Sequence, residues 1–323
     1  MNASTTSILD QVALVNVEMS YWRGEVSLKE AEIEAKKLPK ELIKLGSKRV
    51  IDKKPLIPFG RLYADQRTLL ASIGMRFMGG YAIPLDRIDE VDKELTRIAN
   101  QVKNETQDFV SNYKRYVSEW ADINDNHIPA QVIKDAAPSL AWIESRFGFE
   151  HAIYRMNPAD EVQASRMENQ AKGLINDLFN EISQTASEIF HNKMKGKDVV
   201  KIGALEPLLV LEQKVAGLRF LDSRFEGVAT QLSFVATKIQ RNPDEKIWGP
   251  ELMEIMGFVV LLADSSHLRQ HISSIESAKE KARLAMPQVN TLEVPKELIS
   301  PRLESSSMME IPPKQAVSQM GFF

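Results

Sequence analysis

The sequence predicts an α+β fold that is predominantly α-helical, with long antiparallel heptad-patterned helices and a small sheet or hairpin of short strands. Apolar residues recur at spacings of three and four over long segments, and they alternate with polar residues over short ones. The chain has 323 residues, of which 43% are hydrophobic and 26% are charged. This composition is typical of a folded protein with a substantial core.

The N-terminal part begins with a predicted strand and continues into helix. Residues 12–22 alternate between apolar and polar side chains, as a half-buried strand does. Ser27, followed three residues later by Glu30, has the spacing of a capping box, so a helix is expected to start there. A further short helix is predicted over residues 61–74, which Gly74 would end.

Residues 72–86, SIGMRFMGGYAIPLD, contain few charges and two adjacent glycines. Their alternation predicts one strand over residues 75–83, with a bulge or a close backbone contact at the glycine pair. Two interpretations remain open: a core strand that this chain covers, or a surface left open for another molecule. The residues of that candidate interaction surface are Phe77, Gly79, Gly80, Tyr81 and Ile83.

A long helix is predicted from Asp86 to Ala121, because apolar residues follow a 3-4 spacing through it. At 1.5 Å per residue this helix would extend for roughly 54 Å. Tyr116 and Trp120 continue the pattern at its end and are further candidates for interaction. After a polar break and another helix, a short strand is expected over residues 146–156.

Helices are predicted to dominate the second half of the chain. One helix is expected over residues 161–191, and a strict 3-4 heptad seam extends from Leu218 to Ile239. One or two more helices are predicted up to Met286. Such seams can be buried inside one chain or between copies, so the sequence leaves a homo-oligomer open.

Three regions follow from these patterns. Residues 1–160 form an α+β region, and residues 161–286 form a helical bundle or coiled-coil region. Residues 287–323 are expected to be an extended or disordered tail. The tail ends with Phe322 and Phe323, which would either dock onto a partner or fold back onto the body of this chain.

Several classes of chemistry are not expected. The absence of cysteine excludes disulfides, cysteine-ligated metals and thiol catalysis. No common phosphate-binding or nucleophile motif is present. Asp264, His267 and His271 could face one way on a helix as metal ligands, but no fourth ligand is evident. We therefore expect no cofactor, no metal and no enzymatic activity.

A local excess of positive charge lies between residues 36 and 54. Its candidate phosphate contacts are Lys44, Lys48, Arg49, Lys53 and Lys54. They make nucleic acid a partner to consider, although a solvated lysine-rich face is the simpler interpretation. No apolar run approaches the length of about 20 residues that a membrane-spanning helix needs. With no cysteine and no signal peptide, the protein is predicted to be cytoplasmic.

Three stretches carry a resemblance to a known family: PFGRLYADQRTLLASIGMRFMGGYAIPLDRIDEVDKEL, FVSNYKRYVSEW and SRFGFEHAIYRMNP. Through them, residues 8–240 resemble an uncharacterised bacterial family, known only as a domain of unknown function, of plasmids, integrative elements and phages. Its members often look to be encoded near a MoxR-like AAA+ ATPase and a protein with a von Willebrand A-type domain. The resemblance implies a helical adaptor or substrate of an ATPase machine, and it supplies no catalytic residues.

These features predict a non-enzymatic helical adaptor, or a self-assembling structural protein, of a mobile genetic element that works with an AAA+ ATPase. Two alternatives belong to other classes. A helical membrane-active protein of the pore-forming type would use residues 72–86, although this segment is too short to span a bilayer as a helix. A nucleic-acid-binding component would use the lysine-rich segment.

Overall fold

The computed structural model describes residues 8–28, 46–241, 245–264 and 268. Every described residue belongs to one compact unit of the chain. The predicted C-terminal tail and most of the helix expected from Ser27 therefore lie outside the described residues.

A four-stranded antiparallel sheet with the order β4-β5-β1-β6 organises the first half of the chain. One of its two inner strands, β1 (Val12–Ser20), confirms the strand predicted over residues 12–22. The edge strand β6 (Gly148–Tyr154) confirms the one predicted over residues 146–156. The fold is thus α+β, with a small sheet and a predominance of helix, as the sequence predicts.

The other two strands form a hairpin, in place of the single strand predicted over residues 75–83. β4 (Met75–Phe77) and β5 (Gly80–Pro84) are joined by the two residues Met78 and Gly79. Both have positive φ values, 46° and 84°. Two-residue turns of this kind match the right-handed twist of the paired strands.

The hairpin places the apolar residues of this segment on opposite faces of the sheet. Phe77 pairs with Gly80, and Met75 pairs with Ala82, so each pair shares one face. Tyr81 consequently lies on the face opposite to Phe77. A single strand would have kept the two aromatic residues together, so the sequence-based prediction is wrong on this point.

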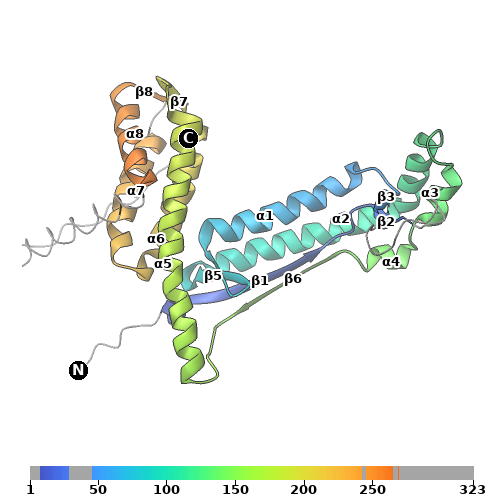
Figure 1. Ribbon diagram of the computed structural model, residues 1–323, viewed down its shortest axis with the longest axis horizontal. Helices are drawn as coiled ribbons and strands as arrows, with labels where there is room; N and C mark the ends of the chain where they lie inside the picture. Colours follow the sequence, from blue (N-terminus) through green and yellow to red (C-terminus); the bar gives the residue numbers. More distant parts are fainter. Residues whose placement is uncertain (1–7, 29–45, 242–244, 265–267, 269–323) are drawn as a thin grey trace, which may run out of the picture. The chain divides into compact units, whose positions relative to one another are not determined.

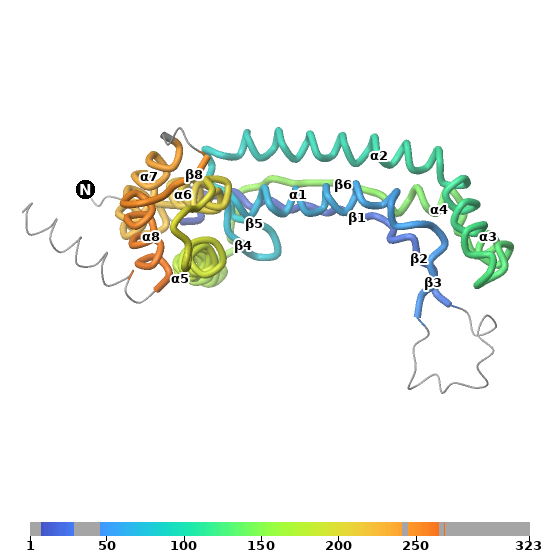
Figure 2. The backbone as a smooth tube through the Cα atoms, turned by 90° about the horizontal axis from the view of Figure 1, so that it is seen from above, coloured from blue at the N-terminus to red at the C-terminus, as the bar shows by residue number. Residues whose placement is uncertain are grey.

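Two long helices cover one face of the sheet. α1 (Ile57–Ile73) and α2 (Ile88–Ile123) lie side by side along β1 and β6 (Figures 1 and 2). Leu70 near the end of α1 packs in the same buried cluster as Val91 near the start of α2, so the helices are antiparallel. α2 confirms the long helix predicted from Asp86 to Ala121.

A second buried cluster joins the start of α1 and the end of α2 to short elements. These elements are β2 (Glu25–Ser27), β3 (Ser47–Arg49), α3 (Ala130–Ala136) and α4 (Leu140–Glu144). Phe59, Tyr113 and Ile143 belong to this cluster. Ser27 is the last residue of β2, which pairs with β3. The capping-box pattern at Ser27 does not predict this strand.

Tyr113 should give the protein a measurable loss of stability at high pH. Its hydroxyl donates a hydrogen bond to the Pro138 carbonyl (2.9 Å), and burial raises its pKa to about 12. The unfolded chain releases this proton near pH 10. The unfolded state binds fewer protons than the folded state between pH 10 and 12, so the free energy of unfolding should fall across this range. The fall should be at most about 3 kcal/mol.

Urea unfolding at pH 9 and pH 11.5 measures this effect. The difference in unfolding free energy between the two pH values should be smaller in Tyr113→Phe than in the original chain. Tyr63→Phe, on the partly exposed face of α1, is the matched control and should keep the full difference. An unchanged difference in Tyr113→Phe would contradict the assignment.

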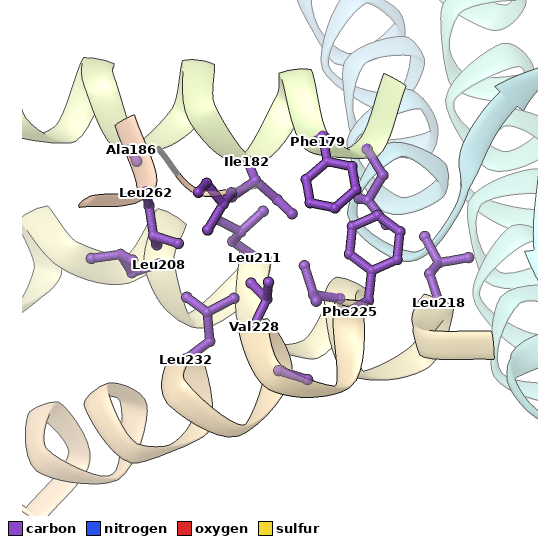
Figure 3. Close-up of a cluster of buried hydrophobic side chains, with 14 of the residues drawn as sticks. Phe179, Ile182, Ala186, Leu208, Leu211, Leu218, Phe225, Val228, Leu232 and Leu262 are labelled. Carbon is purple, nitrogen blue, oxygen red and sulfur yellow. The ribbon is translucent and has the colours of Figure 1, made fainter. Parts of the chain in front are cut away.

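A helical bundle forms the second half. Its helices are α5 (Glu161–Ile189), α6 (Glu206–Leu218), α7 (Arg224–Arg241) and α8 (Gly249–Ala263). Its short hairpin consists of β7 (Val199–Lys201) and β8 (Lys246–Trp248). Figure 3 shows side chains of all four helices, including Phe179, Leu211, Phe225 and Leu262, converging on one core.

The predicted heptad seam is buried, but it does not lie on one helix. Leu218 ends α6, Leu221 lies in a 3-10 turn, and the seam continues on α7 from Phe225 to Ile239. All seven apolar residues of the seam are buried within this chain. The pattern thus predicted burial correctly and helix continuity incorrectly.

The bundle contacts the hairpin and α1 directly. Met75, Phe77 and Ala82 belong to the buried cluster that also contains the bundle core. Lys214 of α6 donates to the carbonyl of Ala71 (2.7 Å) and pairs with Glu181 (2.5 Å). Burial lowers the pKa of Lys214, while Glu181 partly offsets that shift. Residues on both sides of position 160 therefore share one core.

Candidate functional site

The second half of β1 has an unpaired edge in the described part of the chain. β6 pairs with β1 over residues 14–20, whereas β5 pairs with it over residues 12–15. β5 begins only at Gly80, where the hairpin turn ends. Residues 16–20 therefore have a neighbouring strand on one side, and the backbone groups on their other side are available for pairing.

A groove of about 540 Å³ follows this edge. α1 forms one wall, the β4–β5 hairpin closes one end, and β1 and β6 contribute the remaining surface. Its main lining residues are Val17, Met19, Tyr63, Gln66, Arg67 and Arg76. We call it the edge groove.

Gln66 is a polar residue in an otherwise apolar seam of α1. The other buried residues of this seam are Phe59, Leu62, Leu70 and Ile73. Gln66 is only 5% exposed, and its amide has no hydrogen-bond partner among the described residues. Its polar atoms are not among the fully enclosed side-chain atoms that lack a partner, so they reach the surface of the groove. Its location in the groove therefore indicates a role other than stabilising the core.

Two arginines lie on the helix side of the groove. The Arg76 guanidinium lies 4.3 Å from the centre of the Tyr81 ring, and that of Arg67 lies 5.8 Å from the centre of the Tyr63 ring. Within the described chain, neither arginine has a carboxylate at ion-pair distance. Both guanidinium groups are exposed and can bind an anionic group.

Two acidic residues face the other way. Glu18 on β1 and Glu150 on β6 are directly opposite each other in the sheet, and both are exposed. Like charges at opposite positions destabilise a strand pair. No cation among the described residues pairs with either carboxylate. Both residues also line the edge groove, but strand alternation points their side chains to the face opposite to Val17, and therefore away from α1 and α2.

The sequence patterns did not identify Gln66, Arg67 and Arg76, although one signal was present. The buried positions of α1 follow a 3-4-4-3 spacing in which Gln66 occupies a central position. A polar residue at such a position indicates either a buried partner or a ligand. Arg67 and Arg76 had no distinguishing pattern, because only the folded chain brings them to one groove.

The candidate interaction residues of the hairpin are mostly in the core. Phe77 is buried against the bundle, while Tyr81 and Ile83 are buried under α1 and α2. Gly80 is also buried, and only Gly79 lies exposed in the turn. The surface predicted from these side chains is therefore covered by this chain. Their burial gives no support to a membrane-inserting role.

Tyr116 and Trp120 pack half-buried against the cluster at the end of α2. The Trp120 indole donates a hydrogen bond to the carbonyl of Arg49 (3.1 Å). Trp120 thus contacts β3, whereas the Tyr116 ring packs against Phe109 of α2, and both aromatic residues remain partly exposed.

The candidate phosphate contacts do not form one exposed cluster. Arg49 is paired with Glu25 (2.5 Å), and Lys48 is half-buried. Lys53 and Lys54 are exposed, and Lys44 lies outside the described residues. This arrangement offers two described lysines to a phosphate, which does not favour nucleic acid as the partner.

The metal candidates are only partly described. Asp264 is exposed at the end of α8, and His267 and His271 lie outside the described residues. Within the described ranges, no group of three or more potential ligand side chains could hold a metal ion. In the same ranges, no helix combines the length and apolar character needed to cross a membrane.

One comparison with known proteins gives a match. The family model described as a protein of unknown function (DUF3150) matches residues 9–264. No curated protein and no solved structure matches the chain. The match covers the sheet, both long helices and the bundle.

Proposed function

Because the chain belongs to the DUF3150 family of proteins of unknown function, we propose a function from its own surface. It is a non-enzymatic adaptor that binds a partner protein at the edge groove. The observation that carries this proposal is the unpaired edge at residues 16–20 of β1, which lies within the groove. Unpaired strand edges are surfaces at which another polypeptide chain can bind.

The partner in this proposal is an AAA+ ATPase of a mobile genetic element, in the cytoplasm. The support for this identity is the resemblance of residues 8–240 to a family of such elements. The burial of the seam from Leu218 to Ile239 within one chain favours an adaptor over a self-assembling coiled coil. No specific observation favours the membrane-active or the nucleic-acid-binding alternative.

Affinity capture tests the proposal. The tagged full chain, purified from its native host and analysed by mass spectrometry, should retain an AAA+ ATPase. The double variant Arg67→Gln/Arg76→Gln should retain less of it, because both arginines line the groove. Light scattering on the same preparations measures self-assembly. A strict monomer that retains no ATPase would contradict the adaptor function.

A further inference from the structure

We propose that the edge groove binds an extended peptide of a partner protein as an additional strand beside residues 16–20 of β1. The peptide carries an acidic side chain toward α1 and basic side chains on the opposite face. This inference deepens the proposed adaptor function and rests on it for the presence of a protein partner.

The backbone of the sheet supports strand addition. β5 ends its pairing at Val15, and a strand placed beside residues 16–20 would continue the line of β5. Five residues of strand extend for about 17 Å. The groove along this edge has a volume of about 540 Å³, which is within the usual range of ligand sites. An extended peptide would complete the hydrogen bonding of β1 on its open side.

The helix side of the groove determines which side chains fit on one face of the peptide. Alternate side chains of an added strand would point toward α1. There they would meet the apolar Leu70 and Tyr63, the unpartnered amide of Gln66, and the two arginines. An acidic side chain can accept hydrogen bonds from Gln66 and from a guanidinium, so a glutamate between apolar residues fits this side.

The opposite face of the sheet determines which side chains fit on the other face of the peptide. The intervening side chains would point to the face of Glu18 and Glu150, where two carboxylates repel each other. A lysine or arginine on the peptide would neutralise this pair. The predicted ligand therefore alternates between apolar or acidic residues on one face and polar or basic residues on the other.

A fluorescent, end-blocked heptapeptide with the sequence TVKEKVT is a suitable probe for the full chain. Its two valines and its glutamate share one face, and its two lysines share the other. Fluorescence anisotropy should detect saturable binding. Replacing the peptide's glutamate by glutamine, or the protein's arginines in Arg67→Gln/Arg76→Gln, should each weaken binding about tenfold.

Two matched controls separate strand addition from general charge attraction. Arg61→Gln removes an exposed arginine of α1 that does not line the groove, and it should leave the affinity unchanged. A peptide with the same side chains but N-methylated backbone amides cannot pair as a strand, and it should not bind. Amide hydrogen exchange should slow, in the presence of the parent peptide alone, at those of residues 16–20 whose N–H groups point away from β6.

Gln66→Leu tests whether the buried amide serves the ligand. It should not lower the urea midpoint of the free protein, because the amide has no hydrogen bond to a described residue that the substitution would remove. It should also weaken peptide binding about tenfold. A purely structural glutamine would lower the midpoint when replaced and would leave binding unaffected.

The outcomes are distinguishable from those of the capture experiment. Binding of the N-methylated peptide, or unchanged exchange at residues 16–20, overturns strand addition even if the ATPase is captured. Peptide binding without ATPase capture supports this inference and contradicts the proposed partner. A dimer that excludes the peptide would assign the groove to a second copy of the chain and overturn the inference.

Discussion

Replacing Gly80 by alanine should destabilise the protein by roughly 3 kcal/mol. A Cβ atom at this position would lie 2.6 Å from the carbonyl oxygen of Val15 and closer still to the Asn16 side-chain oxygen. The first of these atoms belongs to the backbone of β1, and the second is buried. The Val15 carbonyl cannot move away without opening the pairing of β1 with β5, and the Asn16 side chain would have to rotate out of its buried position.

Urea denaturation measures the Gly80→Ala effect, and Gly173→Ala is its matched control. Gly173 lies within α5, and a Cβ atom there would meet no other atom within 4 Å. The unfolding free energy of Gly173→Ala should rise by about 0.5–1 kcal/mol, because alanine loses less backbone entropy than glycine when it enters a helix. Equal effects of the two substitutions would contradict the close approach at Gly80.

Replacing Phe225 by alanine should cost about 4 kcal/mol of unfolding free energy. Phe225 is fully buried at the centre of the bundle, and its ring centre lies 4.5 Å from that of Phe179 (Figure 3). The substitution removes the ring and leaves a cavity between α5, α6 and α7. Close-packed neighbours on three helices cannot collapse fully into that space.

Phe234→Ala on the same helix is the control for this prediction. Phe234 is 57% exposed, and the Lys238 ammonium group lies 4.6 Å from the centre of its ring. Its removal should change the unfolding free energy by no more than about 0.5 kcal/mol. Similar losses in both variants would show that Phe225 does not occupy the core position described for it.

Local patterns were sufficient for most long elements. The apolar residues of α2 recur from one turn of the helix to the next, so neighbouring residues alone are enough to predict where this helix lies in the sequence. The strands β1 and β6 were predicted by alternation over a similarly short range. α8 begins with Gly249 and Pro250, and a proline in the first turn is typical of a helix start.

The hairpin at residues 75–84 shows where local patterns fail. Met78 adopts φ 46°, a left-handed conformation that methionine rarely has, so its side chain gives no turn signal. The alternation of apolar residues is the same for one strand and for two. The choice between them depends on the pairing of Met75 with Ala82 and on the buried surface that each face meets.

Local sequence patterns were enough to predict the helical character, the principal strands and the burial of the heptad seam, because each depends on residues within a few turns of chain. Only the folded chain shows which face of the hairpin contacts the bundle and where the edge groove lies. That groove exists because β5 pairs with only the first part of β1, a register set between residues more than 60 positions apart. The spacing of residues along the sequence does not predict how far such a strand pairing extends. It also does not predict that Gln66, Arg67 and Arg76 lie together beside it.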